Sequence, residues 1–100
     1  MNLIGPVTSS GLKTASAQIS TMSGFFHSII INTPNTGITT VEIFNSGTSD
    51  TTGRVSLGRF SCAAGQNSLF FAALVPMCAE RGIYASVLSG TAAFVVGYSI

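Results

Sequence analysis

The chain has 100 residues, of which four are Lys or Arg and three are Asp or Glu, so its formal net charge is +1. An ordinary globular domain carries about 25% charged residues, whereas this chain has 7% charged and 46% hydrophobic residues and a mean hydropathy of +0.55. This composition excludes intrinsic disorder and a basic nucleic-acid-binding surface. We therefore expect a single domain over residues 1–100 that is covered in part by a partner, rather than a freely diffusing monomer.

The apolar segments are short and interrupted. The densest run, Leu69–Val75, is far shorter than the ~20 residues that a membrane-spanning helix needs. Residues 1–6 carry neither the basic nor the apolar region of a secretory signal peptide. We expect no membrane partner and no signal peptide.

The strongest structural signal is a series of short apolar runs separated by Gly, Pro, Asn, Ser and Thr every 8–12 residues, with no helical periodicity. It predicts an all-β fold, an antiparallel β-sandwich of about eight short strands. The predicted strands are, in chain order, Ile4–Thr8, Ala15–Thr21, Phe25–Asn32, Ile38–Asn45, Arg54–Cys62, Leu69–Val75, Ile83–Leu88 and Thr91–Ser99. Residues 33–37 form a predicted turn, residues 45–53 a longer polar loop, and residues 1–14 an N-terminal arm that contacts a neighbour.

Two local features are predicted in more detail. A two-residue turn at Ser89 and Gly90 would make the last two strands a hairpin, in which Ala85 faces Phe94 and Ile83 faces Val96. A bulge at Gly58 is predicted because the apolar residues before and after it lie on opposite parities.

Two strands are apolar or small on both sides, namely Leu69–Val75 and Thr91–Ile100. The outer faces of a small sandwich should be polar, so these strands predict cover by a neighbouring subunit; burial under the chain's own loops is the alternative. Arg54 and Arg59 are expected to form ion pairs with Glu42 or Glu80 of another subunit, or else to be solvated. The candidate interface residues are Leu69, Phe70, Phe71, Arg54, Arg59 and Val95.

The residues offer no catalytic, cofactor-binding or metal-binding set, so an enzyme is not expected. His27, the single histidine, lies in a strand pattern, and a Ser–His–Asp triad would need Asp50 without any G-x-S-x-G motif. Cys62 and Cys78 do not have zinc-ligand spacing; buried free thiols, an intrachain disulfide and an interchain bridge all remain open. The loop Asn45–Gly53 is either a recognition loop or a solvated strand connection.

Several segments together resemble small β-rich structural proteins of tailed bacteriophages. They are Gly11–Ile19, Gly24 with Ile29–Asn32, Val41–Ser46, Thr52–Arg54 and Gly82–Thr91. The resemblance implies a jelly-roll-like sandwich on a capsid or tail, commonly a homotrimer, acting as a decoration (cement) or fibre-base protein. It implies as partners the chain itself and a major capsid or other virion protein, and as location the virion, assembled in the host cytoplasm.

Two other function classes are open to the same residues. One is an extracellular pilin-like or adhesin subunit that assembles by strand exchange. The other is a small sugar-binding β-module, although the chain has no Trp and both Tyr84 and Tyr98 fall in predicted strands. The leading hypothesis is a capsid decoration subunit, with a tail or fibre-associated subunit as its nearest alternative.

Overall fold

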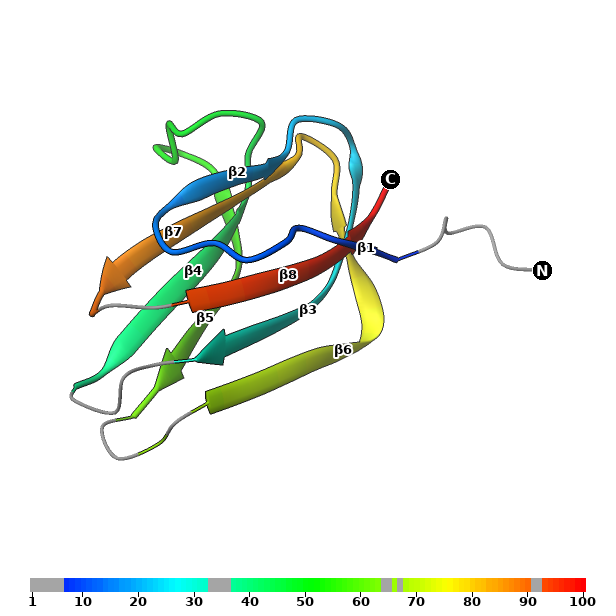
Figure 1. The fold of residues 1–100 in the computed structure, drawn as a ribbon. Coiled ribbons are helices and arrows are strands. Elements are labelled where there is room, and N and C mark those ends of the chain that lie inside the picture. Colours follow the sequence, from blue (N-terminus) through cyan, green and yellow to red (C-terminus); the bar gives the residue numbers. More distant parts are fainter. Residues whose placement is uncertain (1–6, 33–36, 64–65, 67, 91–92) are drawn as a thin grey trace.

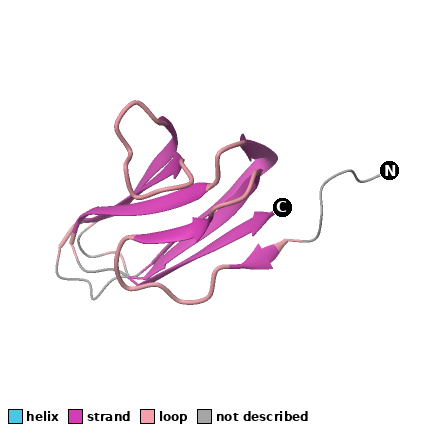
Figure 2. Ribbon diagram, turned by 90° about the horizontal axis from the view of Figure 1, so that it is seen from above, coloured by secondary structure: helices cyan, strands magenta, loops and turns pink. Residues whose placement is uncertain are grey.

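The computed structural model describes residues 7–32, 37–63, 66, 68–90 and 93–100. Within these ranges the chain forms eight strands and no helix, as Figure 2 shows. The strands are β1 (Thr8–Ser9), β2 (Ala17–Ser20), β3 (Gly24–Asn32), β4 (Thr39–Asn45), β5 (Val55–Cys62), β6 (Ser68–Ala79), β7 (Ile83–Ser89) and β8 (Ala93–Ser99). The predicted all-β class and the number of strands are confirmed.

The strands form two antiparallel four-stranded sheets (Figure 1). Sheet A has the order β1-β8-β3-β6 and sheet B the order β2-β7-β4-β5. Of the described strands, only β4 and β5 are neighbours both in sequence and in a sheet; every other pair of consecutive strands is divided between the two sheets. This is the strand order of a jelly roll, and it brings the first strand beside the last.

The predicted hairpin between the last two strands is wrong, because β7 belongs to sheet B and β8 to sheet A. β7 pairs with β2 and β4, while β8 pairs with β1 and β3. Ile83 and Ala85 are nevertheless buried, as are Phe94 and Val96. Ile83 and Ala85 fill the core from sheet B, and Phe94 and Val96 fill it from sheet A. The same alternation of apolar residues is thus compatible with two strands paired in a hairpin and with two strands packed face to face in a sandwich.

The core lies between the two sheets and is built from alternate residues of the central strands. Its fully buried side chains include, from sheet A, Phe26, Ile29, Ile31, Phe94 and Val96 and, from sheet B, Val41, Ile43, Cys62, Ile83 and Ala85. At one side of the core the rings of Phe26, Phe60 and Phe71 contact one another, with centroids 4.8 to 6.3 Å apart.

The bulge predicted at Gly58 is confirmed. Ile43 pairs with Gly58 and the next residue, Phe44, pairs with Ser56, so β5 has one extra residue at this point. The shift lets Leu57 and Phe60 both pack against the core, although they are three residues apart.

The ends of several strands differ from the predicted ones. β6 runs on through Pro76 to Ala79, four residues beyond the predicted end. Of the first predicted strand, Thr8 lies in β1, Val7 does not, and the other residues lie outside the described part of the chain. The predicted turn at 33–37 also lies outside it, except for Gly37. The N-terminal arm stays a prediction, although Thr8, Ser9 and Lys13 all pair with β8 of the same chain.

Candidate functional site

The outer face of sheet A carries a row of apolar side chains. Ile30 of β3 pairs with Val95 of β8 on one side and with Phe70 of β6 on the other. Ile29 and Ile31 point into the core, so by alternation Ile30 and its two partners point outward. Ile30 is 40% exposed and Phe70 is 65% exposed.

The row extends beyond β8 to Leu12, which is 64% exposed. Lys13 forms a bridge with the core-facing Phe94. Since cross-strand partners point to the same side of a sheet, the Lys13 side chain points away from the outer face, and Leu12, one residue earlier, lies beside Val95. Leu12, Ile30, Phe70 and Val95 are called the apolar face below.

A large bulge in β6 adds exposed apolar groups at the edge of this sheet. Met77 pairs with Phe26 and Ala72 with Ser28, so the four residues Ala73–Pro76 lie opposite His27 alone. Within this bulge Leu74 is 100% and Val75 74% exposed. Pro76 has no N–H to donate to another strand.

Sheet A contains no formally charged residue in any of its four strands, Thr8–Ser9, Gly24–Asn32, Ser68–Ala79 and Ala93–Ser99. All seven charged residues of the chain lie in sheet B or outside the eight strands, and of these Lys13 forms an isolated bridge with Phe94 at the edge of sheet A. They are Lys13, Glu42, Asp50, Arg54, Arg59, Glu80 and Arg81. The low content of charged residues is therefore most evident in one layer of the sandwich, sheet A, whose strands have none.

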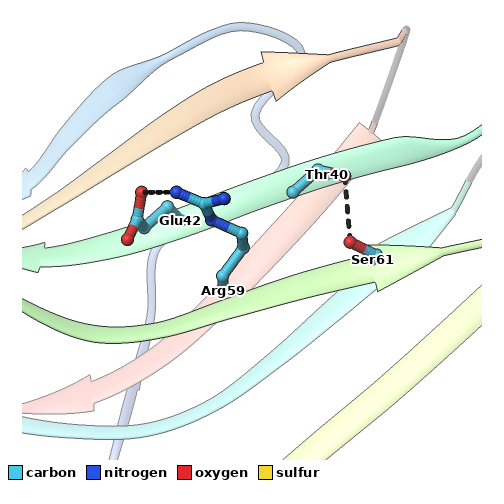
Figure 3. A network of polar contacts seen from close by, with 4 residues as sticks. All are labelled: Thr40, Glu42, Arg59 and Ser61. Atoms are coloured by element: carbon cyan, nitrogen blue, oxygen red, sulfur yellow. Dashed lines mark hydrogen bonds and ion pairs between the residues drawn. The ribbon is translucent and has the colours of Figure 1, made fainter.

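The outer face of sheet B is polar by comparison (Figure 3). Arg59 of β5 forms an ion pair with Glu42 of β4, in which Arg59 Nη2 donates a hydrogen bond to Glu42 Oε1 over 3.2 Å. Beside this pair, the hydroxyl oxygens of Thr40 and Ser61 lie 2.9 Å apart. The Glu42 side chain is only 11% exposed, whereas that of Arg59 is 62% exposed. The pair expected between subunits for Arg59 is thus formed within one chain.

The loop 46–53 is held by its own hydrogen bonds. The Ser46 hydroxyl donates to the carbonyl of Thr48 (2.8 Å) and accepts from its N–H (3.2 Å), and Asp50 Oδ1 accepts the N–H of Thr52 (3.0 Å). Hydrogen bonds from Thr52, and then the charge of Arg54, lower the pKa of Asp50 below its ordinary value. The ionised carboxylate of Asp50 therefore stabilises the folded state above its ordinary pKa, and this stabilisation is lost as the pH falls through the lowered pKa. These hydrogen bonds stabilise the loop as a connection between β4 and β5.

His27 and the cysteines have structural surroundings. His27 Nε2 lies 2.9 Å from the hydroxyl of the buried Ser99. Both cysteines are free thiols, Cys62 buried and Cys78 exposed, so the buried-thiol reading holds for Cys62 alone and the intrachain disulfide is wrong; an interchain bridge stays a prediction. Cys62 Sγ donates to the carbonyl of Gln66 over 3.4 Å.

The six predicted interface residues do not form one site. Phe70 and Val95 lie on the apolar face, whereas Leu69 and Phe71 point the other way and pack against the core. Arg54 and Arg59 belong to the other side of the molecule, before and within β5 of sheet B.

The sequence analysis did not identify Leu12 and Ile30 as exposed residues of the apolar face. The signal for Ile30 was the run Ile29-Ile30-Ile31, because a strand with a single buried face can turn only two of three consecutive residues inward.

Comparisons with models of protein families, with curated proteins and with solved structures found no match to this chain. The described residues contain no group of three or more His, Cys, Asp or Glu side chains placed to hold a metal ion. Over the same ranges, no helix has the length and apolar character needed to cross a membrane. The surface of sheet A is the feature from which function can be argued.

Proposed function

We propose that this chain is a structural subunit of a virion, a capsid decoration or cement protein that stabilises a phage head through contacts between subunits. The observation that carries the proposal is the uncharged sheet A, whose outer face and edge expose Leu12, Ile30, Phe70, Leu74 and Val75. The largest exposed apolar patch of a protein is often its interaction site.

The jelly-roll topology supports the proposal at a coarser level. Two-sheet jelly rolls recur in viral capsid proteins, although they also occur in lectins and cupins. Because one fold serves many functions, stronger support comes from the surface chemistry and from the resemblance of segments such as Val41–Ser46 and Gly82–Thr91 to small phage structural proteins.

A test uses particles assembled from the genome that encodes this chain, with and without its gene. We expect the chain to be present in purified wild-type heads, and heads lacking it to release their nucleic acid at a lower temperature. Equal release temperatures, or absence of the chain from purified particles, would contradict the cementing function.

A tail or fibre-associated subunit is the second candidate, because the same uncharged face would serve assembly there. Immunogold labelling of intact particles with an antibody against the chain separates the two: label on the head supports the decoration protein, and label confined to the tail supports the alternative. Pilin-like strand donation has less support, since Thr8 and Ser9 of the same chain already pair with β8.

A further inference from the structure

We propose that the outer face of sheet A binds the same face of a second copy of this chain around a twofold axis. The occupant of the apolar face would thus be another apolar face, with Leu12, Ile30, Phe70 and Val95 of each copy buried between two packed sheets. The inference deepens the proposed function, because it names the first contact that an assembling subunit would make, and its biological role rests on that function.

The exposed apolar area of the face and of the adjoining β6 bulge approaches what such a contact needs. The five exposed side chains of the apolar face and the β6 bulge leave on the order of 600 Å² of apolar surface in water, at the upper limit of the largest patch on a typical monomer. A standard interface buries about 800 Å² per partner. Three smaller exposed residues of the same sheet add to this area and bring it closer to the area of a standard interface. They are Asn32, Ser68 and Ala72.

The charge distribution favours a second copy of the apolar face over a charged surface as the occupant. A partner that placed a carboxylate or an ammonium group over sheet A would bury it without a counter-ion, because the four strands hold no charged residue, and an unpaired buried charge is costly. The other sheet of this chain carries the Glu42–Arg59 pair on its outer face. The surface of this molecule that matches the apolar face without burying a charge is the apolar face itself, and self-complementary twofold contacts are the commonest kind in homo-oligomers.

The shape of β6 favours packing through the face over pairing through the edge. No other described strand pairs with the outer edge of β6, and the bulge Ala73–Pro76 divides this edge into two short regular segments, residues 68–72 and 77–79. Bulges and proline are the devices that prevent edge-to-edge pairing. Two sheets packed face to face at about 10 Å have no such restriction.

The test compares two charge substitutions at matched positions. Phe70 is 65% exposed on the edge strand of sheet A, and Val55 is 64% exposed on the edge strand of sheet B. We expect the wild-type chain and Val55→Glu to have twice the 10.3 kDa chain mass by size exclusion with light scattering. Phe70→Glu should have the monomer mass at concentrations where the wild type is fully dimeric, with an unchanged circular dichroism spectrum.

A second substitution keeps the test decisive if Phe70→Glu fails to fold. Ala72 is exposed and lies two residues from Phe70 on the same side of β6, so Ala72→Glu should also abolish the dimer. A monomeric wild type at every concentration overturns the inference, even if the monomer binds particles, since the face would then meet another virion protein. A trimer, or a dimer that all three variants retain, overturns it as well.

These outcomes are distinct from those of the proposed function. The mass is measured on the isolated chain and the cementing effect on particles. A dimer that never enters particles contradicts the virion function and leaves the twofold contact standing, whereas a monomer that stabilises heads does the reverse.

Discussion

Gly82 shows how a single residue holds several segments together. It lies between β6 and β7 with a φ of +124°, and a Cβ there would be 2.5 Å from the carbonyl oxygen of Ser20 and 3.1 Å from that of Ser46. Its own carbonyl accepts the N–H of Ser46. Beside it, Gln18 Nε2 lies 2.9 Å from the carbonyl oxygens of Ser20, Ser46 and Ile83, so the ends of β2, β4 and β7 meet at this point.

Replacing Gly82 by alanine should lower the free energy of unfolding by about 3 kcal/mol, because positive φ and a backbone clash are combined there. Gly53→Ala is the control for backbone conformation alone, since Gly53 has a φ of +72° but no atom within 4 Å of its Cβ position; it should cost about 1 kcal/mol. Gly37→Ala has neither cause and should change little. Urea unfolding measures all three, and equal losses for Gly82→Ala and Gly53→Ala would contradict the close packing.

At the scale of strands, residue patterns predicted which side of a strand is buried better than which strand lies beside it. The alternation around Phe94 and Val96 correctly gave the inward residues of β8, and the parity change at Gly58 correctly gave a bulge. The same alternation could not distinguish a hairpin between β7 and β8 from packing across the core. Side-chain periodicity reports burial, whereas hydrogen-bonding partners depend on where the connecting segments lead.

The pairing of β4 with β5 leads to a prediction for the Glu42–Arg59 pair. Glu42 is largely buried and Arg59 is 62% exposed, so removing the guanidinium leaves a covered carboxylate, whereas removing the carboxylate leaves a hydrated cation. Arg59→Gln should therefore lower the free energy of unfolding by about 1 kcal/mol, and Glu42→Gln by less.

Urea unfolding of both single variants and of the double variant measures this difference. The double variant should be no less stable than Arg59→Gln alone, because the penalty disappears with the charge of Glu42. Equal losses for the two single variants would show that the cover over Glu42 is unimportant.

At the scale of the whole molecule, the sandwich separates the chain into a layer without charge and a layer with polar and ionic contacts. The jelly-roll order achieves this by taking β1, β3, β6 and β8, which are far apart in the sequence, into one sheet. The seven charged residues therefore lie in sheet B and in the segments between strands, while the strands of sheet A have none.

A twofold dimer predicts that thermal stability depends on protein concentration, because unfolding would then release two chains from one folded unit. The midpoint of thermal unfolding should rise by about 3–5 °C for each tenfold increase in concentration of the wild type and of Val55→Glu. For Phe70→Glu the midpoint should stay constant over the same range. A constant midpoint for the wild type would contradict a dimer that is coupled to folding.

The candidate surface was predictable only in part. The run Leu69–Val75 was expected to contact a partner, and Phe70 and Val95 do lie on one outer face, but Leu69 and Phe71 face the core and both arginines belong to the other sheet. Leu12 and Ile30 join that face only through pairing across strands. Their partners are distant in the sequence, so no local pattern could have grouped them.

The all-β class, the approximate number of strands, the bulge at Gly58 and the shortage of charge could be predicted from the residues alone. These properties follow from local periodicity, turn residues and composition, each of which acts within a few residues. Which strands share a sheet became clear from the three-dimensional fold, and so did the single uncharged layer with Ile30, Phe70 and Val95 in one row. The physical reason is that strand neighbours are chosen by the burial of whole faces and by the routes of the connections.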